Sequence, residues 1–384
     1  MSLIQRVLTN LEERRQRVLR GDINCIPSPF EKFQQDFPGV EQGKMYLVSG
    51  AAKSGKSQLT SFLFLYNSIL YAHDHPDKVR LKIFYFPLEE TPEKITIRFM
   101  CYLLYKLSPK EHKIRVSPMK LQSVNKGYMV EPEILELLNS IEYRSILDFY
   151  EDHVEFVQER NPTGYWKTVN RYAHDNGTVF KKKVIMENKE TGIPIEKEVF
   201  DYYKPNDPDE YVITIYDHVS LCEQERGMTL KQCIDKLTEY AMVFRNHYNY
   251  IPVLIQQQNM DTISLDAYKS NKIRPTLAGL ADSKDPGKAT SVMLGITNPY
   301  AFELPLYPYP NDNNNPNNYD IRKFGGYFRF LEVVLNREGE SNGTLALYFD
   351  GAINFFGQLP PATNLTELNK IYQLIQRNKG VNPK

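Results

Sequence analysis

Short apolar runs alternate with longer segments of helical spacing over most of the chain. The sequence predicts buried strands at 45–49, 82–86, 211–217, 251–255, 292–297, 328–335 and 344–349. Apolar positions recur with helical spacing at 58–71, through most of 93–180, at 228–248 and at 364–377. Strands that alternate with helices predict an α/β fold, with a mostly parallel central sheet flanked by helices.

The N-terminal segment has an amphipathic pattern of its own. In residues 3–19 apolar side chains recur near helical spacing, Glu and Arg fill the other face, and Gly21 ends the pattern. We therefore expect residues 1–25 to form a helix or linker before the α/β domain. The pattern fits a helix packed on its own domain, and equally an arm that docks on a neighbouring subunit.

Residues 179–210 differ from their surroundings. From 179 to 200 basic, apolar and acidic residues alternate around a Gly-containing turn, and residues 204–210 are rich in Pro and Asp. This pattern predicts an inserted, exposed β-hairpin followed by a polar connector. A plain surface hairpin is favoured over one that contacts DNA.

Composition limits the classes of function. Lys plus Arg and Asp plus Glu are balanced at 47 each, so contact with nucleic acid would need a local basic surface rather than global attraction. The four cysteines are scattered without metal-ligand spacing, which predicts neither a disulfide framework nor a zinc site. A charged N-terminus and the lack of a long apolar run predict a soluble cytoplasmic protein without membrane contact.

One stretch matches the phosphate-binding pattern G-x-x-x-x-G-K-[ST] at every defined position. It follows a predicted strand, opens a predicted helix, and reads Gly50-Ala51-Ala52-Lys53-Ser54-Gly55-Lys56-Ser57. In such a loop two glycines let the backbone N–H groups point into one concavity, and the lysine reaches the outer phosphates. Ser57 would hold Mg²⁺ through its hydroxyl. The stretch therefore predicts a Walker A loop that binds ATP and Mg²⁺.

Polar residues follow three other predicted strands. Glu89 and Glu90 come after 82–86, Asp217 closes 211–217, and Gln257 lies just beyond 251–255. The carboxyl ends of parallel strands meet at the ligand crevice of such a sheet. Glu89 or Glu90 could orient or deprotonate a water, although carboxylates also favour a helix N-terminus. Asp217 has the Walker B position and would hold the Mg²⁺ shell, and Gln257 could sense the γ-phosphate.

A basic segment follows this last strand. Between Met260 and Thr290 it contains both small polar residues and five cations: Lys269, Lys272, Arg274, Lys284 and Lys288. The segment fits a loop region that grips the phosphates of single-stranded DNA. It also fits a solvated loop, because Asp282 and Asp285 dilute its charge.

Together these motifs resemble the RecA-like ATPase domain of hexameric DnaB-type (superfamily 4) replicative helicases, including versions encoded by phages. The resemblance covers about residues 26–356 apart from the 179–210 insertion, so we expect an ATPase domain at 26–360 and a C-terminal helix and tail at 361–384. It implies that Pro87-Leu88-Glu89 carries the catalytic glutamate, that Asp217-His218 is the Walker B motif, and that Gln257 belongs to the glutamine sensor motif.

The resemblance also implies an oligomer. In Leu335-Asn336-Arg337-Glu338-Gly339 it makes Arg337 an arginine finger that reaches the nucleotide of the adjacent subunit in a ring, expected to have six members. The sequence departs from the family at Leu335, where a lysine is usual, and at Met260, where an arginine often stands. The family's N-terminal helical domain has no counterpart in the sequence, so primase or helicase-loader contacts made by that domain are not carried over.

The function implied is ATP-driven 5′-to-3′ translocation on single-stranded DNA, with unwinding of duplex. Two other functions fit the same motifs. A RecA-like recombination ATPase would form open filaments rather than closed rings. A nucleotide-gated, DNA-binding switch would bind ATP without productive hydrolysis, and Leu335 in place of lysine is compatible with it.

Overall fold

A nine-stranded mixed sheet forms the centre of the molecule in the computed structural model, which describes residues 3–187, 194–259, 273–309, 312–341 and 343–380. The strand order is β15-β14-β13-β10-β3-β9-β8-β4-β5. Strands β10 to β5 run parallel, and β13, β14 and β15 extend the sheet as an antiparallel meander. The predicted α/β fold with a mostly parallel sheet is therefore confirmed.

Seven of these strands coincide with the predicted apolar runs, and two do not. The sequence does not predict β5 or β15, because each has only three or four residues and gives no separate apolar run. The bounds are β3 (Tyr46–Gly50), β4 (Arg80–Pro87), β5 (Val154–Phe156), β8 (Glu210–Asp217), β9 (Ile251–Gln257), β10 (Val292–Thr297), β13 (Phe328–Asn336), β14 (Thr344–Asp350) and β15 (Phe355–Gln358).

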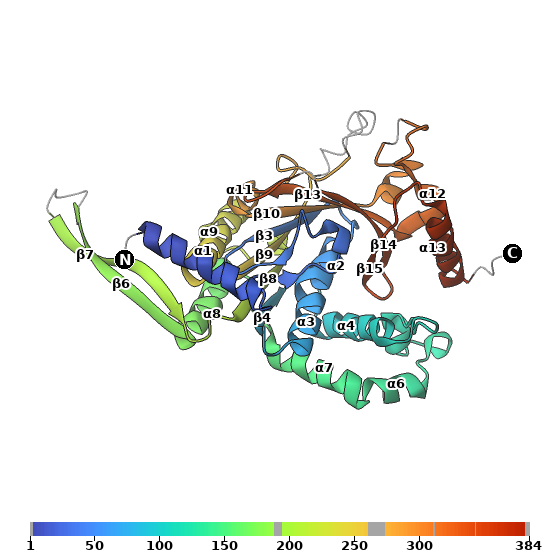
Figure 1. Ribbon diagram of the computed structural model, residues 1–384, viewed down its shortest axis with the longest axis horizontal. Coiled ribbons are helices and arrows are strands. Elements are labelled where there is room, and N and C mark those ends of the chain that lie inside the picture. The colour runs from blue at the N-terminus through green and yellow to red at the C-terminus, as the bar shows by residue number, and fades with distance from the viewer. Residues whose placement is uncertain (1–2, 188–193, 260–272, 310–311, 342, 381–384) are drawn as a thin grey trace.

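Helices cover both faces of the sheet (Figure 1). On one face α2 (Lys56–Thr60), the π-helical turn η2 (Ser61–Tyr66) and α3 (Asn67–Asp74) run on from one another and pack with α4 (Pro92–Leu107) and α7 (Ile141–His153). On the other face lie α8 (Pro162–Asp175) and α9 (Leu230–Tyr248). Both faces of the central strands are buried, which explains why these strands are continuous apolar runs rather than alternating ones.

The remaining helices are peripheral. The short helices α5 (Pro118–Leu121) and α6 (Pro132–Leu138) lie between α4 and α7 in the sequence, and α11 (Asp285–Ala289) precedes β10. Helices α12 (Ile321–Phe324) and α13 (Leu365–Asn378) pack with β13 and β14 around a separate hydrophobic cluster, which includes Phe324, Leu368 and Ile375. The C-terminal helix therefore packs on the body of the molecule. No helix in the described ranges is long and apolar enough to cross a membrane.

The inserted hairpin projects away from the sheet (Figure 1). Its strands β6 (Gly177–Glu187) and β7 (Pro194–Pro205) are antiparallel, and β7 takes in the first two residues of the expected connector. Cross-strand ion pairs join Lys183 to Glu196 at 3.2 Å and Lys182 to Asp201 at 3.1 Å. At the base Phe200 stacks on His247 of α9, with ring centroids 3.8 Å apart. Only the base of the hairpin is thus fixed to the domain.

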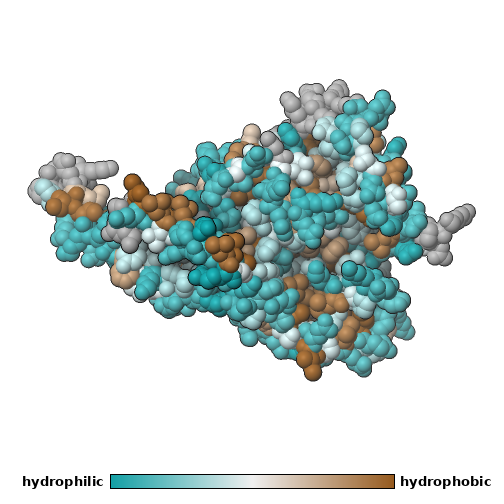
Figure 2. Space-filling model, viewed as in Figure 1, coloured by the Kyte–Doolittle hydropathy of each residue, from teal (hydrophilic) through white to brown (hydrophobic). Residues whose placement is uncertain are grey.

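Helix α1 (Leu3–Leu19) lies across the domain but keeps its apolar side chains in solvent. Ile4, Leu8 and Leu11 are 71, 60 and 59% exposed, and hydrophobic groups are visible along α1 in Figure 2. Its contacts to the domain are polar: Arg17 pairs with Asp209, and Arg14 lies 3.4 Å from Glu41. The apolar stripe that predicts an amphipathic helix is therefore not buried against the described residues of its own chain.

Candidate nucleotide-binding site

The loop between β3 and α2 has the backbone geometry of a phosphate-binding loop. Gly55 adopts φ of +98°, in the left-handed region that favours glycine. A Cβ on Gly50 would lie 2.4 Å from Ser54 Oγ and 2.5 Å from the carbonyl oxygen of Ile296, so only glycine fits there. Helix α2 begins at Lys56, which places the free N–H groups of a helix N-terminus at the loop.

Ser57 and Asp217 meet at the carboxyl end of the sheet. Ser57 Oγ donates a hydrogen bond of 3.1 Å to Asp217 Oδ1, although the two residues belong to strands separated by β9. A hydroxyl and a carboxylate are oxygen ligands of the kind that Mg²⁺ takes, beside phosphate oxygens. The residues at this point therefore fit a Mg²⁺–nucleotide complex.

Asp217 is held by a second donor that the sequence pattern does not reveal. Tyr85 of β4 donates a hydrogen bond of 3.0 Å from its hydroxyl to Asp217 Oδ2. Burial raises the pKa of Asp217 to about 6, against the opposing effect of the Tyr85 and Ser57 hydrogen bonds, and the nearby charges of Glu89 and Glu90 raise it further. The carboxyl group is thus oriented on both oxygens and is poised to exchange a proton for a cation.

Lys56 lies next to these acids. Its side chain is buried, and burial lowers its pKa, while the charges of Glu89 and Asp217 act in the opposite direction. The ammonium group is therefore held in the site between a helix N-terminus and carboxylates, where phosphate oxygens can complete its hydrogen bonding.

The structure distinguishes the two candidate glutamates. Glu90 forms a two-pronged ion pair with Arg98 of α4, in which Arg98 Nη2 lies 2.7 Å from Glu90 Oε1. Glu89 is exposed, and its charge acts on both Lys56 and Asp217. This arrangement favours Glu89 as the carboxylate that is available to a water.

His218 follows Asp217 and is neutral at physiological pH. Burial and the charge of Lys56 lower its pKa to about 4. Its Nδ1 accepts a hydrogen bond of 3.2 Å from the backbone N–H of Ser220, so the ring proton is on Nε2. The imidazole thus offers a donor beside Lys56 without adding charge.

Gln257 stands between two glutamines whose side chains are bonded to the protein. Gln256 Nε2 donates 2.8 Å to the carbonyl of Ser283, and Gln258 Nε2 donates 2.7 Å to Ser49 Oγ of β3. Gln257 is half-buried and points to the other face of β9, at the end of the strand that lies between β3 and β8. Its amide is the one of the three placed to respond to a ligand.

Arg337 lies at the opposite edge of the sheet from the loop of its own chain. It follows β13, whose Asn336 pairs with Val292 at the start of β10, whereas the loop follows the carboxyl ends of the parallel strands. Its guanidinium is exposed and donates 2.8 Å from Nε to the carbonyl of Thr290, while Nη2 contacts the carbonyl of Lys288. Leu335, two residues earlier, packs on the hydrophobic core.

The candidate DNA-contacting residues do not form one described patch. Lys269 and Lys272 lie outside the described residues. Lys284 Nζ donates 2.7 Å to the carbonyl of Ala278, and Lys288 pairs with Asp285 at 2.8 Å, so both engage their own segment. Arg274 is well exposed and lies 3.5 Å from the buried Glu332 of β13, which anchors the end of this segment to the sheet.

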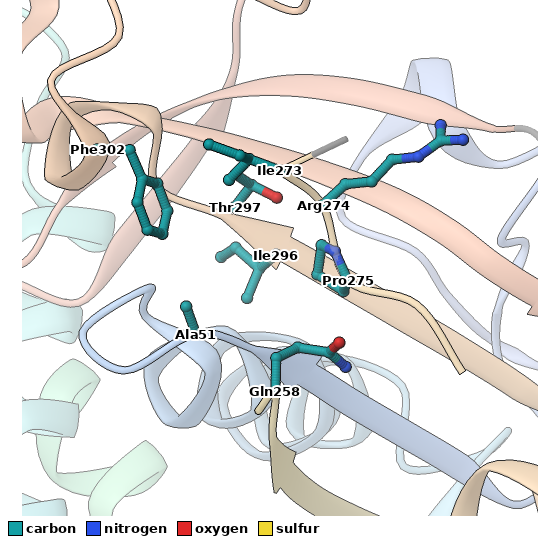
Figure 3. Close-up of a pocket in the computed structure, with 8 residues that line it drawn as sticks. All are labelled: Ala51, Gln258, Ile273, Arg274, Pro275, Ile296, Thr297 and Phe302. Carbon is teal, nitrogen blue, oxygen red and sulfur yellow. The ribbon is translucent and has the colours of Figure 1, made fainter. Parts of the chain in front are cut away.

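A small cavity of about 20 Å³ lies beside the loop (Figure 3). Ala51 of the loop and Gln258 of β9 line it from one side, and Ile273, Pro275 and Phe302 from the other. Its volume admits about one water molecule, so it is not a nucleotide pocket. Instead, it marks where the phosphate-binding loop packs against the segment that carries Arg274.

The fold and this site define the class: a RecA-like P-loop nucleotide-binding domain. Among solved structures the chain is similar to the ATPase domain of a phage DnaB-like helicase, with a TM-score of 0.57 and 12% identity over 94% of this chain and 99% of that one. It is similar to a DnaB-like replicative helicase, described with its primase interactions, with a TM-score of 0.57 and 11% identity over 94% of this chain and 67% of that one. No family model matches the sequence, and no curated protein sequence gives a significant match. The likeness is one of fold.

Sequence reasoning missed three side chains at the site. Tyr85 holds Asp217, Arg98 holds Glu90, and Arg329 of β13 donates from Nε to the carbonyl of Ser54 in the loop at 2.6 Å. Each belongs to an ordinary strand or helix pattern and carries no motif of its own. Only their positions in the fold reveal them.

Proposed function

We propose that the protein is an ATP-dependent DNA helicase, which hydrolyses ATP between subunits of a homo-oligomeric ring, translocates on single-stranded DNA and unwinds duplex. The observation that supports this proposal most is the contact between Ser57 of the phosphate-binding loop and Asp217 of β8, on a sheet with the fold of DnaB-like ATPase domains. It brings a complete set of phosphate and Mg²⁺ ligands to one edge of the sheet.

Substrate binding uses the loop and the residues around it. The backbone N–H groups of residues 50–57 surround the phosphates, and Lys56 contacts the outer ones. Ser57 and Asp217 hold Mg²⁺, which neutralises charge on the β- and γ-phosphates when bound. Tyr85 keeps the Asp217 carboxylate in one orientation.

Hydrolysis needs a water and a base. Glu89 accepts a proton from the attacking water, whose oxygen forms a bond to the γ-phosphorus, while the bond from that phosphorus to the bridging oxygen breaks and ADP departs with the electron pair. Gln257 contacts the γ-phosphate and reports its loss to the segment that follows β9. This role agrees with its position between the Walker A and Walker B strands.

The neighbouring subunit completes the site. Arg337 is too far from its own loop to act there, so we assign it to the nucleotide of the adjacent subunit, where its guanidinium offsets charge in the transition state. Arg245 lies beside it and donates 2.6 Å to the carbonyl of Ala289, so the same edge carries a second cation. Leu335 in place of lysine leaves these two arginines as the cations of that edge.

ATP turnover by the purified protein, with and without single-stranded DNA, tests the proposal. We expect DNA-stimulated hydrolysis by an oligomer seen in mass photometry, and then displacement of a strand from a forked duplex. Lys56→Ala should abolish turnover, and the exposed Lys110→Ala serves as a control with wild-type turnover. Nucleotide binding without turnover in wild-type protein would contradict the proposal and favour a nucleotide-gated switch.

A further inference from the structure

Arg329 is a buried cation behind the phosphate-binding loop. Its side chain is only 5% exposed. Nε donates to the carbonyl of Ser54 at 2.6 Å, and Nη1 donates to the carbonyls of Gly326 and Phe328 at 2.9 and 2.7 Å. The guanidinium also lies over the ring of Phe349, 4.5 Å from its centroid. The group is thus fixed between a strand and the loop.

The charge of Arg329 has no acidic partner among the described residues. All of its hydrogen bonds go to neutral carbonyls, and burial is the sole influence on its pKa, which is lowered to about 9. The guanidinium still carries its proton at neutral pH. Buried charges in proteins are normally paired, because an unpaired one loses its hydration without compensation.

The contact to Ser54 fixes one peptide group of the loop. The carbonyl of Ser54 and the N–H of Gly55 belong to the same planar, trans peptide, so they point in opposite directions. Because Arg329 holds this carbonyl on its own side of the loop, the N–H of Gly55 is directed to the other side. A guanidinium on the carbonyl also polarises the peptide and makes its N–H a stronger donor.

Resting on the proposed function, we propose that Arg329 is a positioning residue for the nucleotide: it orients the Ser54–Gly55 peptide toward the phosphates and supplies a positive charge whose counter-charge is the bound polyphosphate. Attraction between charges is strong where water is excluded, so a cation behind the loop still acts on phosphates in front of it. Arg329 therefore contributes to affinity for nucleotide without contacting it.

Binding of a fluorescent ADP analogue with Mg²⁺ tests this inference in wild-type protein, Arg329→Gln and Arg329→Lys. Gln keeps a hydrogen-bond donor but loses the charge, and we expect ADP affinity to fall about tenfold or more. Lys keeps the charge and we expect it to restore a large part of the loss. The control is Arg322→Gln, which removes an exposed arginine paired with Asp320 at 2.9 Å and should bind ADP as the wild type does.

The outcomes separate the inference from the proposed function. Wild-type affinity in a folded Arg329→Gln protein overturns the inference, and so does a Lys variant that binds as weakly as the Gln variant. If the Gln protein does not fold, the ADP-induced rise in melting temperature of the Lys variant decides: a rise smaller than that of wild type supports the inference, and an equal rise overturns it. If wild-type protein does not bind ADP, the proposed function itself fails.

Discussion

At the scale of single residues, Asp217 combines the strongest opposing effects in the site. Its carboxyl group is 4% exposed and accepts hydrogen bonds from Ser57 and Tyr85, yet burial still raises its pKa to about 6. The folded protein therefore binds this proton more tightly than the unfolded chain does. Ionising Asp217 destabilises the nucleotide-free protein, and Mg²⁺ offsets that cost when it binds.

This effect predicts that Asp217→Asn stabilises the nucleotide-free protein. The cost is absent below the ordinary aspartate pKa of 3.8, grows as pH rises, and is complete above about 6. At pH 8 we expect the free energy of unfolding to rise by up to about 3 kcal/mol, at about 1.4 kcal/mol for each unit of pKa. Near pH 4 the difference should disappear. Urea denaturation of both proteins at the two pH values measures it.

The same substitution should abolish Mg²⁺-dependent ATP turnover, because a metal ligand is lost. Asp285→Asn is the matched control: the pKa of Asp285 is lowered, first by its hydrogen bond from Lys288, so its removal should not stabilise the protein at pH 8. Destabilisation of the nucleotide-free protein by Asp217→Asn at pH 8 would contradict this account.

The sequence predicts part of this residue-level picture. Lys56, Ser57 and Asp217 can be found because a loop of fixed spacing and a strand end specify their places. Tyr85 and Arg329 cannot, since their partners lie 132 and 275 residues away in the chain and nothing local marks them. The choice between Glu89 and Glu90 likewise needs Arg98, which is eight residues from Glu90 but meets it only through the start of α4.

At the scale of elements, β13 carries a bulge that the apolar pattern does not show. Met293 pairs with Leu335 and Leu294 with Val333, so Val334 is an extra residue in β13. A bulge of this kind bends the strand and re-aims the side chains beyond it. Strand length and register after the bulge, and hence the direction of Arg337, depend on pairing with β10 and could not be read from the sequence.

Arg337 yields a prediction about mixed oligomers. Arg337→Ala and Lys56→Ala should each be inactive, but a 1:1 mixture should recover turnover, because some interfaces combine an intact loop with an intact arginine. Random mixing gives such interfaces a share of about one quarter, so we expect about a quarter of wild-type turnover. ATP hydrolysis after subunit exchange measures it. An inactive mixture in verified mixed oligomers would contradict action between subunits.

Helix α1 yields a second prediction at this scale. Its exposed leucines contact little of their own domain, so Leu8→Asp should leave the stability of the monomer within about 0.5 kcal/mol. If the stripe docks on a neighbouring copy, the same change should shift the protein toward smaller species in mass photometry. Thr9→Asp, one position further along and on the polar face, should keep the wild-type distribution. Equal distributions for the two variants would assign α1 no part in assembly.

At the scale of the whole molecule, the order of motifs predicts the fold better than it predicts the accessories. The sheet follows from apolar runs that alternate with helical segments, and its parallel strands bring Lys56, Glu89, Asp217 and Gln257 to one edge. The C-terminal meander and the position of α13 follow from long-range packing around the cluster with Phe324, which local patterns do not encode. The hairpin is predictable as an element, but its direction is not.

The hairpin predicts a silent deletion. Lys183 and Glu198 are paired across it, so an Asn-Gly link can replace residues 184–197 with a tight turn while the base with Phe200 and Tyr203 remains. Because the outer part is held by its own cross-strand contacts, we expect unfolding free energy to change by less than about 0.5 kcal/mol. DNA-stimulated ATP turnover should also be unchanged. A loss of DNA stimulation with normal basal turnover would instead assign the outer hairpin to DNA.

Strand β13 joins three of the features described above. It carries Arg329 behind the loop, Glu332 beside Arg274, and leads to Arg337 at the far edge. Arg329 and Arg337 are eight residues apart, or about 26 Å along an extended strand. In the proposed ring, the two ends of this one stiff segment would belong to two different ATP sites. Each subunit would thus have a built-in ruler between its own nucleotide and its neighbour's, and a shift of the strand at one site would be felt at the next.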